Sequence, residues 1–217
     1  MARNFVVAST QQLTLASALV AAYPFTVAGW FRQPSGAPSG VLFALGNTTT
    51  SPHRWCLIST LGAGLELQAA DANPASSAPT TTLIAADTWH HAAGVCASAT
   101  SRSVYLDGGG KSTDTTNRTP TVDTTNFGVV NIGGVFYAYL TGLLAEWAVW
   151  DVALTDAEVA ALAKAWSPDA IRPAARIAYW KLFGNDSPER DSWKNSYDLT
   201  LVNSPVKGDH PRIYYRG

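Results

Sequence analysis

Glu146 is the residue whose type and surroundings most invite a chemical role. It is the one acid in the apolar stretch LLAEWAVW (143–150), which has the pattern of a strand. Glycoside hydrolysis uses two carboxyl groups that flank the scissile bond. Residues two apart on a strand share a face, but Leu144 and Ala148 hold those positions here. The strand itself therefore gives Glu146 no paired carboxylate, and only an aspartate distant in sequence could approach it in space.

Other catalytic signatures are also missing from the sequence. The four glutamates, at positions 66, 146, 158 and 189, include no two that are spaced to share a site. No C-x-x-C, H-E-x-x-H, G-x-S-x-G or phosphate-loop motif occurs. Cys56 and Cys96 lie in apolar runs typical of buried thiols, and the sequence leaves open whether they are bonded to each other. We predict a non-enzymatic protein in which Glu146 is a structural, hydrogen-bonded acid, with glycoside hydrolysis as the less favoured alternative.

The composition limits the partners. The chain has 217 residues, of which 47% are hydrophobic and 14% charged, and its formal net charge is -1. A chain of this size can bury the core of one domain without disulfides or metal. No cluster of Lys and Arg exceeds two residues, so the electrostatic footprint of a nucleic-acid-binding protein is missing. We predict one domain over 1–217 with no nucleic-acid partner.

The N-terminal segment 5–31 carries no charge, so it has to be compared with a signal peptide and with a membrane span. The polar run STQQ (9–12) interrupts the apolar core that a signal peptide requires. Gln11, Gln12 and Pro24 disfavour a membrane span. The sequence therefore predicts strands of a protein that is made in the cytoplasm without a signal peptide and has no membrane partner.

Short apolar or alternating segments, separated by turn residues, dominate the rest of the chain. Segments rich in Gly, Pro, Ser, Thr and Asn, such as 33–40, 47–53, 71–79 and 107–120, have the composition of turns. Many short strands without helices between them favour an all-β fold, an antiparallel two-sheet sandwich or jelly roll. The predicted strands are 4–8, 13–15, 25–33, 40–47, 54–60, 65–70, 80–85, 89–98, 102–108, 128–134, 140–151, 176–183 and 197–202.

One short helix is predicted at about 155–166. Thr155 and Glu158 form the T-x-x-E capping box, in which each side chain accepts a hydrogen bond from a free backbone N–H. Val159, Leu162, Ala163 and Trp166 would share one face of this helix. That face is predicted to pack against the sheet, so Thr155 and Glu158 are structural residues.

Four segments carry a family resemblance. FTVAGWFR (25–32) resembles the FTISAWV strand of concanavalin A-like lectin/glucanase domains, in particular their laminin-G-like jelly rolls. TWHHAAGV (88–95) is similar to their WHHVAGT strand, and RSVYLDGG (102–109) to LYVDG. LTGLLAEWAVWDVALTDAEVAAL (140–162) resembles their ending GxIDEVRIYNRALSxxEIxxL. The resemblance implies a jelly roll, with His90 and His91 as sheet residues instead of metal ligands.

The order of the segments departs from the family pattern. Many such domains begin with a segment like YYPFDGNANDSSGNGNDGTL, whereas the similar segment of this chain, 178–205, comes last. This looks like a circular permutation, which antiparallel sandwiches tolerate because their termini often lie close together. We predict that 176–183 completes the sheet near the N-terminal strands. A structure that places 176–206 as a detached appendage would refute this.

Calcium is the one metal that the resemblance raises. Several relatives bind Ca²⁺ through acidic loops, and Asp186, Glu189 and Asp191 gather in one loop of this chain. Their spacing does not match a dedicated calcium loop, and turn formation explains them equally well. We predict no metal and no cofactor, with Ca²⁺ as an open alternative.

Two aromatic clusters are hard to place in a core. Phe136, Tyr137 and Tyr139 lie beside a Gly-rich turn and are candidate contacts for a glycan or a partner. The end of the chain, 207–217, is a candidate docking tail. Its assembly residues would be Ile213, Tyr214, Tyr215 and Arg216, which are types enriched in interfaces.

Two functions therefore follow from the sequence. The first is a structural or binding module in a multimeric assembly, such as a phage capsid decoration protein, a tail accessory protein or another cell-surface assembly protein, because related domains occur in virion and bacterial surface proteins. The second is a glycan-binding lectin, whose partner is a carbohydrate.

Overall fold

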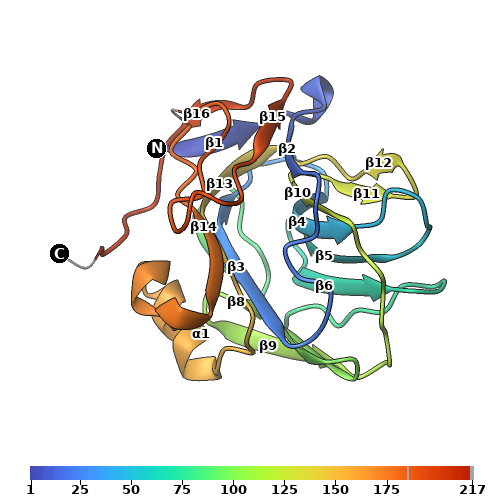
Figure 1. The fold of residues 1–217 in the computed structure, drawn as a ribbon. Helices are drawn as coiled ribbons and strands as arrows, with labels where there is room; N and C mark the ends of the chain where they lie inside the picture. The colour runs from blue at the N-terminus through green and yellow to red at the C-terminus, as the bar shows by residue number, and fades with distance from the viewer. Residues whose placement is uncertain (185, 216–217) are drawn as a thin grey trace.

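The computed structural model describes residues 1–184 and 186–215, and in them two antiparallel sheets pack face to face (Figure 1). Sheet A has the order β16-β1-β13-β3-β7-β8-β9, with β14 also paired to β13. Sheet B has the order β15-β2-β10-β4-β5-β6, and β11 and β12 form a separate hairpin. The predicted all-β sandwich with one short helix is confirmed.

The strands of sheet A are β1 (Ala2–Phe5), β3 (Phe25–Arg32), β7 (His90–Ser98), β8 (Ser101–Leu106), β9 (Gly109–Asp114), β13 (Gly142–Trp150), β14 (Arg176–Trp180) and β16 (Val206–Gly208). Those of sheet B are β2 (Gln12–Leu15), β4 (Gly40–Gly46), β5 (Arg54–Ser59), β6 (Leu65–Ala70), β10 (Thr124–Phe127) and β15 (Thr200–Val202). The hairpin consists of β11 (Val130–Ile132) and β12 (Val135–Tyr137), and 3₁₀ turns occupy Val7–Ser9, Pro168–Ala170 and Pro173–Ala175.

Large aromatic side chains fill the space between the sheets. Phe43 and Trp147 stack with ring centroids 6.2 Å apart, and Phe127 meets Trp180 edge to face at 5.3 Å. Alternation along each strand sends one set of side chains inward and the other outward. In β3, Val27 lies in this core, whereas its neighbour Ala28 belongs to a second cluster on the outer face of sheet A.

The C-terminal segment is part of the sheet. β14 pairs with residues 147–150 of β13, and β1 pairs with residues 142–144 of the same strand. The two therefore lie one after the other along one edge of β13. β16 then pairs with β1, and β15 pairs with β2. The prediction that 176–183 completes the sheet near the N-terminal strands is confirmed for β14, and 176–206 is not a detached appendage.

Helix α1 (Asp156–Ala163) covers the outer face of sheet A, at the lower left of Figure 1. Thr155 and Glu158 form the predicted capping box, and Val159 and Leu162 are buried against the sheet. The helix is shorter than predicted, because the chain turns into the left-handed region at Ala165 (φ 65°). Trp166 was therefore wrongly placed on the buried face and is 50% exposed instead.

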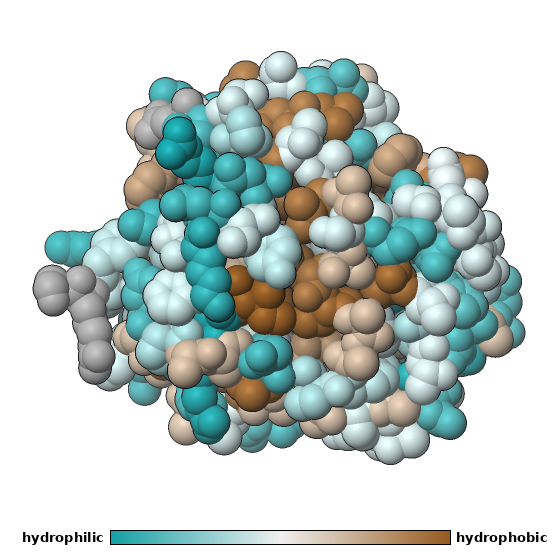
Figure 2. Space-filling view, in the orientation of Figure 1, coloured by the Kyte–Doolittle hydropathy of each residue, from teal (hydrophilic) through white to brown (hydrophobic). Residues whose placement is uncertain are grey.

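One side of the sandwich is closed mainly by a connection. Figure 2 shows hydrophobic residues gathered in the middle of this face, over the chain that joins β2 to β3. Val20 in that connection is half-buried and packs against the main core. No helix among the described residues has the length and apolar character needed to cross a membrane.

Candidate functional site

Glu146 lies in a bulge of β13. The register of β13 against β3 shifts between Ala145 and Ala148, and Glu146 has a left-handed backbone (φ 58°). Its side chain is buried, and its Oε2 accepts a hydrogen bond from the Tyr179 hydroxyl on β14. Burial raises the pKa of Tyr179, and the negative charge of Glu146 raises it further, so the phenol stays protonated and donates. Glu146 is thus an acceptor held by neighbouring strands.

The second oxygen of Glu146 is occupied by the C-terminal tail, residues 209–215. The Tyr215 hydroxyl donates to Glu146 Oε1 at 2.7 Å, and His210 Nε2 lies 2.9 Å from the same oxygen. Tyr214 forms a parallel bridge beside Trp166, in which its N–H donates to Ala165 and its carbonyl accepts from Ser167. The tail thus rests on its own domain and covers Glu146, while the predicted assembly residue Arg216 lies outside the described residues.

The hairpin β11–β12 presents the predicted aromatic residues. Val130 packs on the outer face of sheet B against Val41, Ala44 and Cys56. The outer strand β12 is exposed throughout, so Phe136 and Tyr137 face solvent, while Tyr139 is half-buried. These residues form an exposed aromatic edge.

Two of the three carboxylates of the acidic loop, those of Glu189 and Asp191, are buried, whereas Asp186 is exposed. Glu189 pairs with the buried Arg3 at 2.6 Å. Asp191 Oδ1 accepts from the backbone N–H groups of Tyr179 and Trp193, each at 3.0 Å. Within residues 1–184 and 186–215, no group of three or more His, Cys, Asp or Glu side chains is arranged to hold a metal ion. Ca²⁺ binding stays an untested alternative.

The histidines and cysteines are sheet residues in this structure. His90 Nδ1 lies 2.7 Å from Asp107 Oδ2, and this contact raises the pKa of His90. Burial lowers the pKa of His91 to about 4, so its ring is neutral near pH 7. Cys56 and Cys96 are free and buried, and burial raises the pKa of Cys56 to about 11. Neither thiol is a reactive nucleophile in this state.

A hollow of about 200 Å³ lies at one end of the sandwich. The register places the end of β4 beside the start of β5 and the end of β6, so the loops that follow or precede them gather at this end. The same end holds the connections 16–24 and 115–123. The lining residues are Ala21, Ala22, Tyr23, Trp55, Thr119, Pro120 and Thr121. We call this feature the loop-end hollow.

The walls of the loop-end hollow are joined by hydrogen bonds. Trp55 Nε1 donates to the Tyr23 hydroxyl at 3.0 Å, and that hydroxyl donates to the carbonyl of Arg118 at 2.8 Å. Thr121 donates through its backbone N–H to His53 Nδ1 at 2.9 Å. The connections from both sheets are thereby fixed relative to one another before any ligand arrives.

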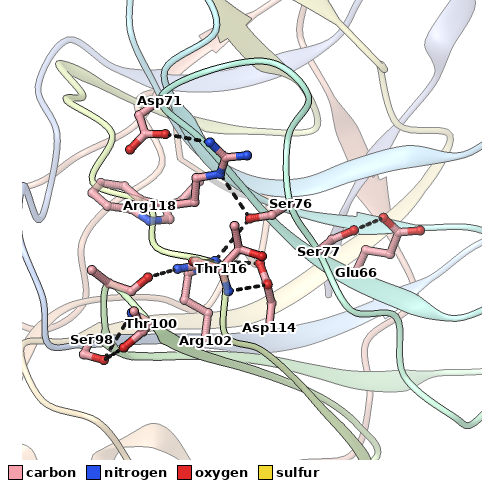
Figure 3. Close-up of polar contacts among 12 residues, drawn as sticks. Glu66, Asp71, Ser76, Ser77, Ser98, Thr100, Arg102, Asp114, Thr116 and Arg118 are labelled. Carbon is pink, nitrogen blue, oxygen red and sulfur yellow. Dashed lines mark hydrogen bonds and ion pairs between the residues drawn. The ribbon is translucent and has the colours of Figure 1, made fainter.

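Two arginines brace the neighbouring loops, and Figure 3 shows their polar contacts. Arg118 Nη1 lies 3.0 Å from Asp71 Oδ1, and the second oxygen of Asp71 accepts from the N–H of Thr119 at 2.6 Å. The buried Arg102 pairs with Asp114 at 2.5 Å and also donates to the carbonyl of Thr116 and the hydroxyl of Ser76. These guanidinium groups are engaged by protein acceptors and position the loops, and neither arginine lines the hollow.

Sequence reasoning missed the loop-end hollow. The segments 47–53 and 107–120 have turn composition, which marks loops without showing which of them meet. Tyr23, Trp55 and Pro120 are far apart in sequence and come together only through the strand register of both sheets. The alternation of apolar residues gives no signal for that register between distant strands.

The chain belongs to the concanavalin A-like lectin/glucanases superfamily. The family model matches residues 7–160, which is more than half of the chain. The match confirms the resemblance seen in the four sequence segments. None of the curated proteins matches the chain.

Solved structures share the fold. A heptameric SAP-like pentraxin from Limulus polyphemus aligns with a TM-score of 0.66 and 19% identity, covering 92% of this chain and 89% of the pentraxin. The CBM40 of Ruminococcus gnavus IT-sialidase, bound to alpha2,3 sialyllactose, aligns with a TM-score of 0.59 and 15% identity, covering 66% of this chain and 84% of the CBM40. A third structure is domain 4 of AbnA, a GH43 extracellular arabinanase from Geobacillus stearothermophilus, in complex with arabinotriose. It aligns with a TM-score of 0.54 and 21% identity, covering 69% of this chain and 71% of domain 4. At these identities the likeness establishes the fold.

Proposed function

We propose that the protein is a non-catalytic carbohydrate-binding module whose site is the loop-end hollow. The observation that carries this proposal is a preorganised, uncharged hollow with aromatic and hydroxyl groups, built from loops at one end of the sandwich. Binding residues commonly lie on loops that a rigid scaffold positions. A ligand that enters such a hollow incurs little cost for ordering the protein.

The lining fits a neutral sugar ring. One face of a sugar carries C–H groups that pack on apolar and aromatic surfaces, while its hydroxyls need hydrogen-bonding partners. Tyr23 supplies aromatic surface, with the buried Trp55 beneath it, and Pro120 and the two alanines supply apolar surface. Thr119 and Thr121 line the same hollow, and although their hydroxyls contact Asp71 Oδ2 at 3.4 Å and His53 Nδ1 at 2.8 Å, each keeps a lone pair that can accept from a sugar hydroxyl. Because no lining residue is charged, the hollow favours neutral sugars over acidic ones.

Glu146 has no part in this site. It is 1% exposed, and both of its oxygens are occupied by protein groups. A catalytic carboxyl group must touch the bond that it cleaves, so the docked tail keeps Glu146 from such a role. We therefore propose that bound sugar is released unchanged.

Two of the fold neighbours support a carbohydrate ligand, since one was solved with alpha2,3 sialyllactose and another with arabinotriose. The assembly role in a virus particle, expected from the sequence, stays a prediction. The candidate docking tail is docked on its own domain in this structure.

The test is calorimetric titration with a panel of neutral trisaccharides (arabinotriose, cellotriose, maltotriose and galactotriose) and with sialyllactose. Ala22 is exposed and lines the hollow, so Ala22→Trp places an indole where the sugar would lie. Ala16→Trp, at an exposed position of the same connection outside the lining, is the matched control. We expect Ala22→Trp to weaken binding of a neutral trisaccharide at least about tenfold, or about 1.4 kcal/mol, and Ala16→Trp to leave it unchanged. Equal affinities of the two variants would refute the site.

A further inference from the structure

A second aromatic hollow lies between the tail and the end of α1. Its volume is about 210 Å³, and it is lined by Trp166, Ala170, Tyr214 and Tyr215. These three aromatic side chains are 50%, 61% and 43% exposed, respectively. In Figure 1 the helix and the tail lie on the left, on the outer face of sheet A, whereas β5 and β6 of sheet B lie on the right. This second hollow, which we call the tail hollow, is therefore separate from the loop-end hollow.

The tail hollow is held in place by polar contacts. The N–H of Tyr214 donates to Ala165 at 2.8 Å, and the N–H of Ser167 donates to the carbonyl of Tyr214 at 3.1 Å. These two bonds join the backbone of Tyr214 to the residues that precede and follow Trp166. The Tyr215 hydroxyl reaches the buried Glu146, so that ring is fixed at both ends. Large aromatic surfaces are thus kept exposed and rigid, although folding alone would favour burying them.

The size of the tail hollow argues for a small ligand. A specific protein interface buries about 800 Å² on each partner, and pockets for drug-sized molecules measure about 300–1,000 Å³. A hollow of about 210 Å³ falls below that range and matches a single ring.

The chemistry of the lining argues for a neutral ring that carries hydroxyl groups. All four lining residues are uncharged. Among residues 1–184 and 186–215, neither the indole N–H of Trp166 nor the hydroxyl of Tyr214 has a hydrogen-bond partner, and both side chains are exposed. Charges of both signs lie beside the hollow. Lys181 Nζ is 4.9 Å from the centroid of the Tyr215 ring, and the negative charge of Asp169 acts on the Tyr215 hydroxyl, so like-charge repulsion disfavours both cationic and anionic ligands.

We infer that the tail hollow is a second carbohydrate site, which takes one neutral sugar ring between Trp166 and Tyr214. The inference rests on the proposed carbohydrate function and adds a site that does not share residues with the loop-end hollow. Because Tyr214 and Tyr215 belong to the tail, this site exists only while the tail is docked. Glu146 is then a positioning residue, which holds Tyr215 and touches no ligand.

The test is a titration of ¹⁵N-labelled full-length protein with the same neutral trisaccharides, followed at single residues by NMR. The Trp166 indole and the backbone amide of Ala170 report the tail hollow, and the amides of Thr119 and Thr121 report the loop-end hollow. In Trp166→Ala the amide of Ala170 reports the tail hollow. We expect both sets to shift in the wild type. Trp166→Ala should abolish only the tail-hollow response, and Tyr137→Ala, which removes an equally exposed aromatic residue from the hairpin, should change neither.

The role of Glu146 is tested in the same assay. Glu146→Gln should weaken binding at the tail hollow about fivefold or more, as expected when an interface loses one charged hydrogen bond, and should leave the loop-end affinity unchanged. If Glu146→Gln fails to fold, Tyr215→Phe removes only the hydroxyl and should produce the same selective loss. Equal losses at both hollows would show a general structural effect and overturn the positioning role.

The outcomes separate this inference from the proposed function. Shifts at Thr119 and Thr121 with an unmoved Trp166 indole would overturn the second site and leave the proposed function intact. Shifts at Trp166 alone would support the second site and overturn the assignment of function to the loop-end hollow. No shift at either place with any trisaccharide of the panel would overturn both.

Discussion

Replacing Asp114 by asparagine should destabilise the protein by a calculable amount. Asp114 pairs with the buried Arg102 at the end of β9, and the pair joins the loops behind the loop-end hollow. Partial burial raises the pKa of Asp114, but the N–H of Thr116, the hydroxyl of Ser76 and the guanidinium of Arg102 outweigh it and lower the pKa to about 2. A depressed pKa means that folding favours the ionised carboxylate.

The magnitude follows from linkage. The ordinary pKa of the group is 3.8, and each tenfold change in proton affinity corresponds to about 1.4 kcal/mol, so the ionised Asp114 contributes about 2.5 kcal/mol to the free energy of unfolding. This contribution is fully present above pH 3.8 and is lost as the pH falls through about 2. The side chain is 8% exposed, so solvent screening reduces it little.

The assay is urea unfolding of wild type and Asp114→Asn at a series of pH values. We expect a difference of about 2.5 kcal/mol at pH 7, closing as the pH is lowered from 4 towards 2. Asp209→Asn is the control, because Asp209 is 88% exposed and lies 3.8 Å from Arg32, and it should leave the free energy unchanged. A difference for Asp114→Asn that stays constant down to pH 2 would refute the electrostatic reasoning.

Three further predictions concern the scaffold. The contact of His90 with Asp107 raises the pKa of His90. The stabilisation that this contact gives the fold is therefore present below the ordinary pKa of about 6.5 and is lost as the pH rises through the raised value. Thermal melts from pH 5 to 8 should show a falling melting temperature in wild type and no such fall in Asp107→Asn. Gly29→Ala should lower the melting temperature, because the added Cβ would lie 2.3 Å from the Trp147 ring and overpacking costs about 1–3 kcal/mol. An unchanged melting temperature would show that the ring can move aside. Leu162→Ala should lower the free energy of unfolding, measured in urea, by about 2–4 kcal/mol, because it leaves a cavity beneath α1. A decrease below about 1 kcal/mol would mean that the helix repacks.

The central strands could be predicted from the sequence because they are strongly apolar and bounded by turn residues. β3, β7 and β13 lie where the sequence places them. β9 was missed, because GGKSTD has turn composition; Asp107 and Gly108 both take positive φ and form a tight turn that pairs this polar segment with β8. The segment 80–85 was wrongly predicted as a strand, and it makes only an isolated bridge between Ile84 and Leu61.

The sites were less predictable than the strands. Phe136 and Tyr137 are exposed as their uncharged, Gly-flanked segment indicates, yet exposure alone does not make a hollow. The loop-end hollow depends on which distant loops meet, and the tail hollow depends on the turn at Ala165 that directs Trp166 outward. Neither feature has a local pattern, because both arise from tertiary pairing.

The most direct measurement of the central claim is a crystal structure of the protein with the tightest-binding neutral trisaccharide. The account predicts a sugar ring in the loop-end hollow, with its C–H face on Tyr23 and Pro120 and a hydroxyl within hydrogen-bonding distance of Thr119 or Thr121. A saturated complex whose sugar lies only on the β12 edge, at Phe136 and Tyr137, and leaves the loop-end hollow empty would contradict it.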